Sequence, residues 1–196
     1  EPITLVAVGP LTNLAVAFML DPSIIGKVKK IVVMGGGYQV TNATSTAEFN
    51  IWYDPEAAQH VLNSGAEIVL VPLDATHKAC VSKPDCDKLR EINTKASVFA
   101  AALIEQRILM HNAFQPLDIP DAAAVHDALA VCYVIDESVL KDVRKVHCEI
   151  GFRGVGEGQT VIDPRFYTED KNCAFAFDGD REMFVAMLSE ILGLEK

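Results

Sequence analysis

Two groups of polar residues in this sequence could do chemistry. In the first group, Asn42, Glu48 and Asn50 crowd around the aromatic Phe49. Carboxylate and amide groups together can hold vicinal hydroxyls, as a sugar-binding site requires. The alternative is a hydrogen-bonded brace within a loop, because polar side chains also bond to nearby backbone groups. Spacing alone favours neither interpretation.

The second group is the dipeptide His126-Asp127. An imidazole that titrates near neutrality is suited to proton transfer, and the adjacent carboxylate is a hard oxygen ligand suited to calcium. The alternative is an acidic helix cap with a neighbouring histidine, since Asp is a favoured capping residue. Taken alone, the dipeptide favours the cap.

The elements that must position these groups alternate between strands and helices. Apolar runs predict strands at residues 3–8, 30–34, 67–71, 146–150, 160–162 and 174–177. Apolar periodicity and helix-start signals predict helices at residues 11–20, 54–64, from 82 onward, 94–111 (amphipathic), 125–135 and 179–192. This alternation predicts an α/β fold with a mainly parallel, Rossmann-like sheet and helices on both faces. We expect a single domain over residues 1–196.

Two long loops are predicted between these elements, at residues 35–53 and 112–123. In open parallel sheets ligands bind beyond the carboxyl ends of the strands. The positions to inspect are therefore those after Val8, Met34 and Pro72. The densest polar group follows Met34, which makes the first loop the better candidate for a binding site.

The composition favours small-molecule chemistry. Half of the 196 residues are apolar, which is enough for one ordinary core. Acidic residues outnumber basic ones, 27 against 17, and the basic residues are not gathered into a stripe. This distribution argues against nucleic acid or an anionic membrane surface as partner. The odd number of cysteines, 5, and the lack of a C-x-x-C pair predict reduced thiols. Without a membrane-length apolar run or a leader, we expect a cytosolic location.

Five ordered blocks of sequence carry a family resemblance. They are Val8-Gly9-Pro10-Leu11-Thr12-Asn13, Val33-Met34-Gly35-Gly36, Ala47-Glu48-Phe49-Asn50-Ile51-Trp52, Asp54-Pro55-Glu56-Ala57-Ala58 and His126-Asp127-Ala128-Leu129-Ala130. Together they resemble the inosine-uridine preferring nucleoside hydrolases, and they span nearly the whole chain. The resemblance implies calcium-dependent hydrolysis of the N-glycosidic bond of purine or pyrimidine ribonucleosides.

The same resemblance implies roles for individual residues. It implies that ribose is contacted by Met34, Asn42, Glu48 and Asn50, and that Phe49 lines the pocket. It further implies that the Val8 carbonyl and the Asp127 side chain bind calcium, and that His126 faces the leaving base. Outside these blocks we expect His77 to serve a turn or cap, and His60 and His147 to be structural or exposed.

The sequence departs from the family pattern in two respects. The D-x-D-x-x-x-D-D segment, which supplies the other calcium carboxylates and the base, is not among these residues. Because calcium takes about six to eight oxygens, we expect this chain, the C-terminal portion of such a domain, to bind calcium weakly and hydrolyse poorly by itself. The family's leaving-group tyrosine is also missing before His126. His111 or Phe114 could occupy that region, or His111 could simply end its helix.

Two other functions fit these departures. A non-catalytic module could retain ribose or nucleoside binding through Asn42, Glu48 and Asn50. A structural subunit could instead pair with an N-terminal fragment through the exposed edge of an incomplete sheet. As partners we expect a ribonucleoside substrate and further copies of the chain in a homo-oligomer, but neither nucleic acid nor membrane.

Overall fold

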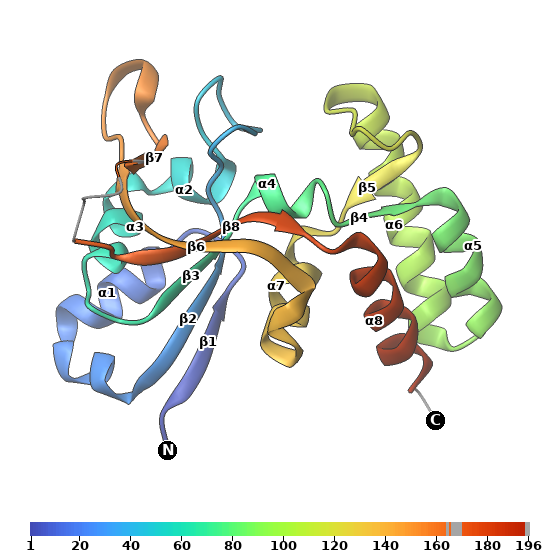
Figure 1. Cartoon of the computed structure of the whole chain (residues 1–196), viewed down its shortest axis with the longest axis horizontal. Coiled ribbons are helices and arrows are strands. Elements are labelled where there is room, and N and C mark those ends of the chain that lie inside the picture. The colour runs from blue at the N-terminus through green and yellow to red at the C-terminus, as the bar shows by residue number, and fades with distance from the viewer. Residues whose placement is uncertain (164, 166–169, 195–196) are drawn as a thin grey trace. The chain divides into compact units, whose positions relative to one another are not determined.

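The computed structural model describes residues 1–163, 165 and 170–194 (Figure 1). The chain divides into two compact units of mixed α/β structure. The first comprises Glu1–Asp74 and Asp142–Phe177, and the second comprises Ala75–Lys141 and Asp178–Lys196. The single domain expected over residues 1–196 stays a prediction.

A six-stranded sheet forms the centre of the first unit. Its strands, in spatial order, are β1 (Ile3–Ala7), β2 (Val28–Met34), β3 (Ile68–Val71), β8 (Cys173–Gly179), β6 (Leu140–Ile150) and β7 (Thr160–Asp163). The pairs β1–β2, β2–β3 and β3–β8 are parallel, whereas β6 and β7 are antiparallel. Each strand overlaps a predicted one, although β6 begins at Leu140, six residues earlier than predicted. The mainly parallel sheet is confirmed.

The hydrophobic core of the first unit lies between this sheet and two helices, α1 (Thr12–Leu20) and α3 (Pro55–Leu62). Ile31 and Val33 of β2 point to the same face because side chains alternate along a strand. They pack with Phe18 of α1, Val61 of α3 and Phe175 of β8, all of them buried. A short 3-10 helix, η1 (Pro22–Lys27), leads from α1 into β2.

The predicted start of α3 is confirmed in atomic detail. Asp54 caps the helix, because its carboxylate accepts a hydrogen bond from the backbone N–H of Ala57 at 3.0 Å. Pro55 follows at the first helical position, where the missing N–H costs nothing.

The antiparallel strands β6 and β7 follow later in the chain, and the 3-10 helix η3 (Gly154–Gly156) lies between them in sequence.

The second unit is mainly helical. Helix α4 (Leu73–Thr76) begins in the first unit and ends in the second. The other helices of the second unit are α5 (Lys83–Ile92), α6 (Lys95–Phe114), α7 (His126–Ile135), the 3-10 helix η2 (Glu137–Val139) and α8 (Arg181–Gly193). A short antiparallel pair, β4 (Cys80–Ser82) and β5 (Ala122–Ala124), connects them. Arg181 joins α8 to the start of α5 by hydrogen bonds to the buried carboxylate of Asp85 and to the hydroxyl of Ser82.

Both predicted loops contain regular structure. Residues 49–53 form α2 (Phe49–Tyr53), a five-residue helix inside the first predicted loop. The second predicted loop begins as the last turn of α6 and ends in β5. His111 lies in the last turn of α6, as expected, but the helix continues to Phe114. The imidazole is buried, which lowers its pKa, so it is not the exposed cationic group expected at a helix end.

The helix α6 is not amphipathic, contrary to the prediction. Its exposed side includes Phe99, Leu103, Met110 and Phe114, each at least half exposed. Their spacing of four, seven and four residues places them in one stripe along the helix. Its buried side contains Ala101, Ile104 and Ile108, so α6 presents apolar side chains on both sides.

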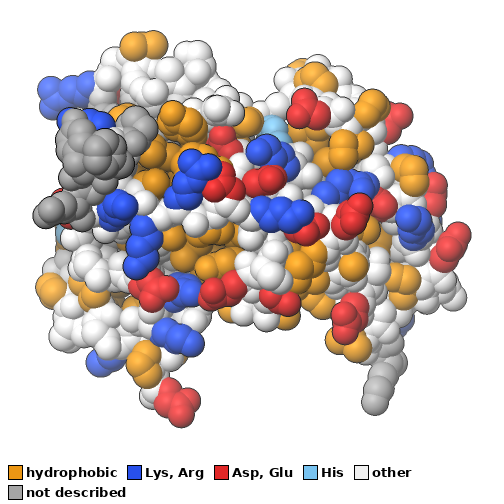
Figure 2. Space-filling view, in the orientation of Figure 1, with side chains coloured by type: hydrophobic (Ala, Val, Ile, Leu, Met, Phe, Trp, Pro, Cys, Tyr) orange, Lys and Arg blue, Asp and Glu red, His pale blue; other side chains and the backbone are white. Residues whose placement is uncertain are grey.

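The surface and the thiols show two further features. Figure 2 shows Lys and Arg side chains interspersed with Asp and Glu on the face drawn. All five cysteines are buried, and none takes part in a disulfide. Within the described ranges no helix is long and apolar enough to cross a membrane.

Candidate active site

The loop that follows β2 begins with three buried glycines. Gly36 has a φ of +82°, a conformation that L side chains rarely adopt. A Cβ on Gly37 would lie 1.9 Å from the carbonyl oxygen of Val40. The chain can turn back this tightly only because these positions carry no side chain.

Glu48 braces this loop from within. Its side chain is only 2% exposed. One carboxylate oxygen accepts a hydrogen bond from the backbone N–H of Asn50 at 2.9 Å, and the other accepts from Ile51 at 3.1 Å and Gly36 at 2.9 Å. A carboxylate offers about four acceptor positions, so three backbone donors occupy most of them. Glu48 thus serves as the loop brace that the sequence allowed as an alternative.

The two asparagines keep part of their hydrogen-bonding capacity. Asn50 donates from Nδ2 to the carbonyl and to the sulfur of Met34, at 3.0 and 3.4 Å. Its Oδ1 has no hydrogen-bond partner in the described part of the chain. Asn42 accepts the backbone N–H of Phe49 at 2.9 Å through Oδ1, which leaves its Nδ2 as a donor. The loop therefore offers one amide oxygen and one amide NH2 to a ligand.

The remaining predicted residues of the first unit lie beside these groups. Phe49 is 47% exposed and lies against Trp52 and Tyr53. Val8 directly follows β1, and the pairing of Ala7 with Val33 places Val8 and Met34 at the same edge of the sheet. The first unit thus brings together six of the eight predicted site residues.

Sequence reasoning missed two residues that hold this loop. The buried carboxylate of Asp74 accepts the backbone N–H groups of Tyr38 and Gln39, at 2.7 and 2.8 Å. Thr160 accepts a weaker hydrogen bond from Gly37 at 3.4 Å. The position of Asp74 after β3, at the carboxyl edge of the sheet, was the available signal. Thr160 is 123 residues from Gly37, and no local pattern indicates that contact.

The other two predicted residues belong to the second unit. His126 and Asp127 open α7, whose N-cap is Val125. Asp127 makes no hydrogen bond or ion pair with any residue that the structure describes, and partial burial raises its pKa. The interpretation of Asp127 as a helix cap is therefore wrong, and its carboxylate is free to meet a ligand.

His126 is one of three clustered histidines. The ring centroids of His77 and His126 are 5.8 Å apart, and His111 lies 5.8 Å from His77 and 6.2 Å from His126. Burial, followed by the charges of neighbours such as Arg107, lowers the pKa of His126 to about 3 and that of His77 to about 4. The prediction that His126 titrates near neutrality is wrong. His77 does occupy a turn after α4, but within this cluster.

Comparison with known proteins assigns the chain to a family. The family model of the inosine-uridine preferring nucleoside hydrolases matches residues 1–186. The chain belongs to this family. It is 43% identical over 168 residues to the inosine-uridine preferring nucleoside hydrolase of Crithidia fasciculata, covering 84% of this chain and 51% of that protein. It is 34% identical to the pyrimidine-specific ribonucleoside hydrolase of Photobacterium profundum, covering 98% of this chain and 62% of that protein.

Solved nucleoside hydrolases share the fold. A plant nucleoside hydrolase superposes with a TM-score of 0.87 and 30% identity, covering 98% of this chain and 62% of that one. A purine-preferring ribonucleoside hydrolase from Gardnerella vaginalis superposes with a TM-score of 0.85 and 28% identity, over 97% and 60% of the two chains. The chain thus spans about half to three fifths of the length of these relatives.

The described part of this nucleoside hydrolase chain does not fit a complete calcium site. It contains no group of three or more His, Cys, Asp or Glu side chains that could hold a metal ion. The Val8 carbonyl and Asp127 would supply two of the roughly six to eight oxygens that calcium takes. No chemical step can therefore be assigned to calcium from these residues.

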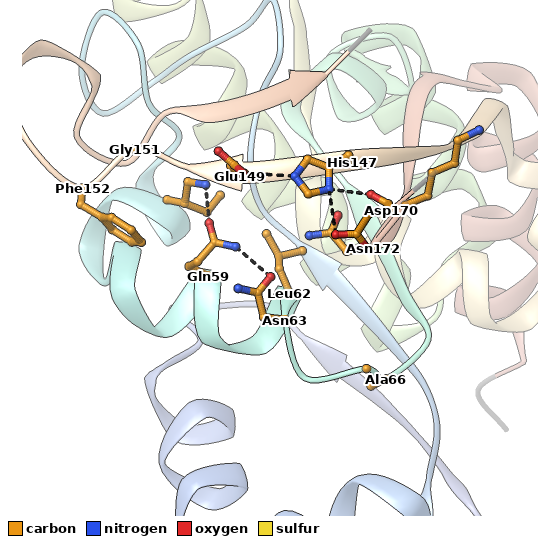
Figure 3. A pocket seen from close by; sticks show the side chains of 13 residues that line it. Gln59, Leu62, Asn63, Ala66, His147, Glu149, Gly151, Phe152, Asp170 and Asn172 are labelled. Carbon is orange, nitrogen blue, oxygen red and sulfur yellow. Dashed lines mark hydrogen bonds and ion pairs between the residues drawn. The ribbon is translucent and has the colours of Figure 1, made fainter. Parts of the chain in front are cut away.

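A sizeable cavity lies away from the predicted site residues, none of which lines it. It measures about 940 Å³ and lies in the first unit, around His147 (Figure 3). Its polar side chains bond largely to one another and to the backbone. His147 contacts the Asp170 carbonyl at 2.6 Å and Glu149 at 3.2 Å, and Gln59 accepts the Ile150 N–H at 2.7 Å. We do not assign the hydrolase site to it, because none of the eight predicted site residues lines it.

Proposed function

We propose that the protein containing this chain is a nucleoside N-ribohydrolase. It would break the bond between ribose C1′ and the base nitrogen, with water supplying a hydroxyl to C1′ and a proton to the base. The observation that carries this proposal is the family match over residues 1–186, which includes both units. Relatives named for inosine-uridine and for pyrimidine substrates support ribonucleosides as the substrate class.

We assign ribose binding to the loop after β2. A ribose hydroxyl can both donate and accept, so it can donate to Oδ1 of Asn50 and accept from Nδ2 of Asn42. Glu48 would hold Asn50 in place through its hydrogen bonds to the backbone N–H groups of Asn50 and Ile51. Met34 would lie against the sugar, and the exposed ring of Phe49 would cover it.

We assign the leaving base to His126 in the second unit. Stabilising the departing base lowers the barrier to cleavage, and a positioned imidazole is a common donor for this purpose. The Nε2 atom of His126 is buried and has no partner in the described residues, so it is available to a ligand.

Further expectations stay predictions. In a longer protein we propose that the Val8 carbonyl and Asp127 are two of the ligands of a calcium ion. A cytosolic location, a homo-oligomer and the acceptance of purine nucleosides are likewise proposed.

The first test combines intact mass with binding and hydrolysis on the same purified sample. Inosine and uridine would be offered to the 196-residue chain, to Asn42→Ala and Asn50→Ala, and to the control Asn63→Ala. Asn63 is an exposed asparagine of the first unit, and among the described residues it bonds only to Gln59 and the backbone. We expect the first two variants to lose ribonucleoside affinity by at least tenfold and the control to keep it. If the two variants and the control bound the ribonucleosides with equal affinity, the assignment of the ribose site would be overturned.

One structural feature favours an alternative for the isolated chain. Strand β1 is an edge of the described sheet, and its Ile3 is 57% exposed. Such an edge can pair with another strand. This edge would suit a fragment that needs an N-terminal partner. The other alternative, a module that binds nucleoside without cleaving it, does not depend on the edge. Binding without turnover would indicate the module, whereas activity gained on adding the N-terminal segment of a relative would indicate the fragment.

A further inference from the structure

The three clustered histidines differ in how their ring nitrogens are used. His111 accepts the backbone N–H of Ala124 through Nε2 at 3.4 Å, and its Nδ1 lies 2.9 Å from the carbonyl oxygen of Gln115. A neutral ring carries one hydrogen, so in His111 it is on Nδ1. Both nitrogens of His111 are thereby satisfied, which gives this histidine a structural role.

His77 and His126 are different, because each has a buried Nε2 with no hydrogen-bond partner in the described residues. Leaving a buried polar atom unpaired costs about 1–3 kcal/mol. More than about nine tenths of buried polar groups in proteins do find a partner. Two such atoms in one cluster therefore indicate a place that receives a polar atom of a ligand.

The other nitrogen of His126 is held by Thr76. The Thr76 hydroxyl lies 2.8 Å from Nδ1 of His126, and Thr76 is the fully buried last residue of α4. The hydrogen bond made by one nitrogen decides which nitrogen carries the hydrogen. If the hydroxyl donates to Nδ1, then Nε2 is an N–H donor. If Nδ1 donates to the hydroxyl, then Nε2 is only an acceptor.

We propose that Thr76 donates to Nδ1 and so fixes His126 as the tautomer with its hydrogen on Nε2, the atom offered to the leaving base. The choice of donor rests on the proposed function, since a departing base gains electrons and needs a donor. Thr76 is then a positioning residue that acts through His126. The resemblance to the family assigned it no role.

Nitrogen-15 NMR of histidine side chains in the 196-residue chain tests the tautomer without any hydrolysis. At pH 7.5 we expect the Nδ1 shift of His126 to be that of an unprotonated nitrogen, and the Nε2 shift that of an N–H. Thr76→Ser keeps the hydroxyl and should retain this pattern. Thr76→Val has the same shape without the hydroxyl, and both shifts should move toward an average.

Thr94→Val is the matched control. Thr94 is also in the second unit, where it caps α6 and donates to the Leu192 carbonyl at 2.7 Å. The control should lose a cap, worth about 1 kcal/mol, yet leave the shifts of His126 unchanged. A hydrogen on Nδ1 in the unaltered chain, or shifts unaffected by Thr76→Val, would overturn the proposal.

Hydrolysis separates the positioning role from the proposed function. In a preparation that hydrolyses nucleosides, Thr76→Val should lower kcat for inosine at least tenfold. It should lower kcat for a riboside with a nitrophenolate leaving group by less than threefold. Equal slowing of both substrates would overturn the role of Thr76 toward the base. Absence of turnover even with the N-terminal segment supplied would overturn the proposed function, while the NMR result would still decide the tautomer.

Discussion

The carboxylate of Glu48 accepts a hydrogen bond from the backbone N–H of Gly36 at 2.9 Å, twelve residues earlier in the chain. This contact ties the turn after β2 to the start of α2. The residue that the family resemblance places against ribose is therefore also the residue that shapes the loop. Loss of binding in a Glu48 variant would not by itself prove contact with the sugar, and stability has to be measured beside affinity.

Glu48→Ala should lower the free energy of unfolding by about 3 kcal/mol or more, because it leaves three buried backbone N–H groups without an acceptor. Urea unfolding followed by circular dichroism measures the change. Glu56→Ala removes an exposed glutamate from the same unit and should stay within about 0.5 kcal/mol. Equal effects of the two substitutions would contradict the bracing role.

Gly37→Ala should destabilise the chain by about 3 kcal/mol or more, because the added methyl would lie 1.9 Å from the Val40 carbonyl oxygen. This cost is at the upper end of that of ordinary overpacking, or above it. Gly9→Ala is the control, since a Cβ there has nothing within 4 Å. Thermal unfolding should show a drop of roughly 6–12 °C for the first variant and almost none for the second. A Gly37 variant as stable as the Gly9 variant would show that the turn can relax at little cost.

Asp85→Asn should cost about 2–4 kcal/mol, because Arg181 would lose the carboxylate that it pairs with inside the second unit. Asp87→Asn, two residues later, removes an exposed partner of Lys83 and should cost less than about 0.5 kcal/mol. Urea midpoints for the two variants give the comparison. Similar midpoints would mean that the Asp85–Arg181 pair adds little.

Acid should weaken the fold through His77. Its pKa falls from 6.5 to about 4 on folding because the ring is buried, so the unfolded chain binds more protons between these values. This contribution to stability is complete above pH 6.5 and is lost as the pH falls toward 4. In urea unfolding at pH 7.5, 6.5 and 5.5, His77 should contribute a decrease of roughly 1 kcal/mol over this range. His126, whose pKa burial lowers to about 3, adds a share of its own, and His77→Gln should make the total decrease smaller. An unchanged slope in that variant would exclude His77 as its source.

The sequence predicted most of the fold because the relevant signals are local. The run from Ile31 to Met34 is apolar on both faces, as a buried parallel strand requires. The adjacent residues Asp54 and Pro55, an N-cap and a first helical residue, predict the start of α3. The short helix α2 was missed because a glutamate caps it, and β5 was missed because its three alanines favour a strand only through pairing with Cys80–Ser82.

The candidate site could be predicted only in part. The resemblance supplied Asn42, Glu48, Asn50 and His126, and the structure adds which of their atoms are already occupied. The contacts of Thr160 with Gly37 and of Thr76 with His126 join segments 123 and 50 residues apart. Tertiary packing creates such contacts, and no spacing rule along the chain indicates them. The pKa of His126 likewise follows from burial, which its neighbours in sequence do not reveal.

The apolar side chains exposed along α6 set a practical limit on how this protein can be handled. At neutral pH a net charge of −10 keeps molecules apart, but this repulsion disappears as the solution approaches the isoelectric point near 4.9. Phe99 and Phe114 would then be free to associate between molecules, and precipitation should precede unfolding. Storage and crystallisation trials are best begun well above that pH, at low salt, where colloidal repulsion is strongest.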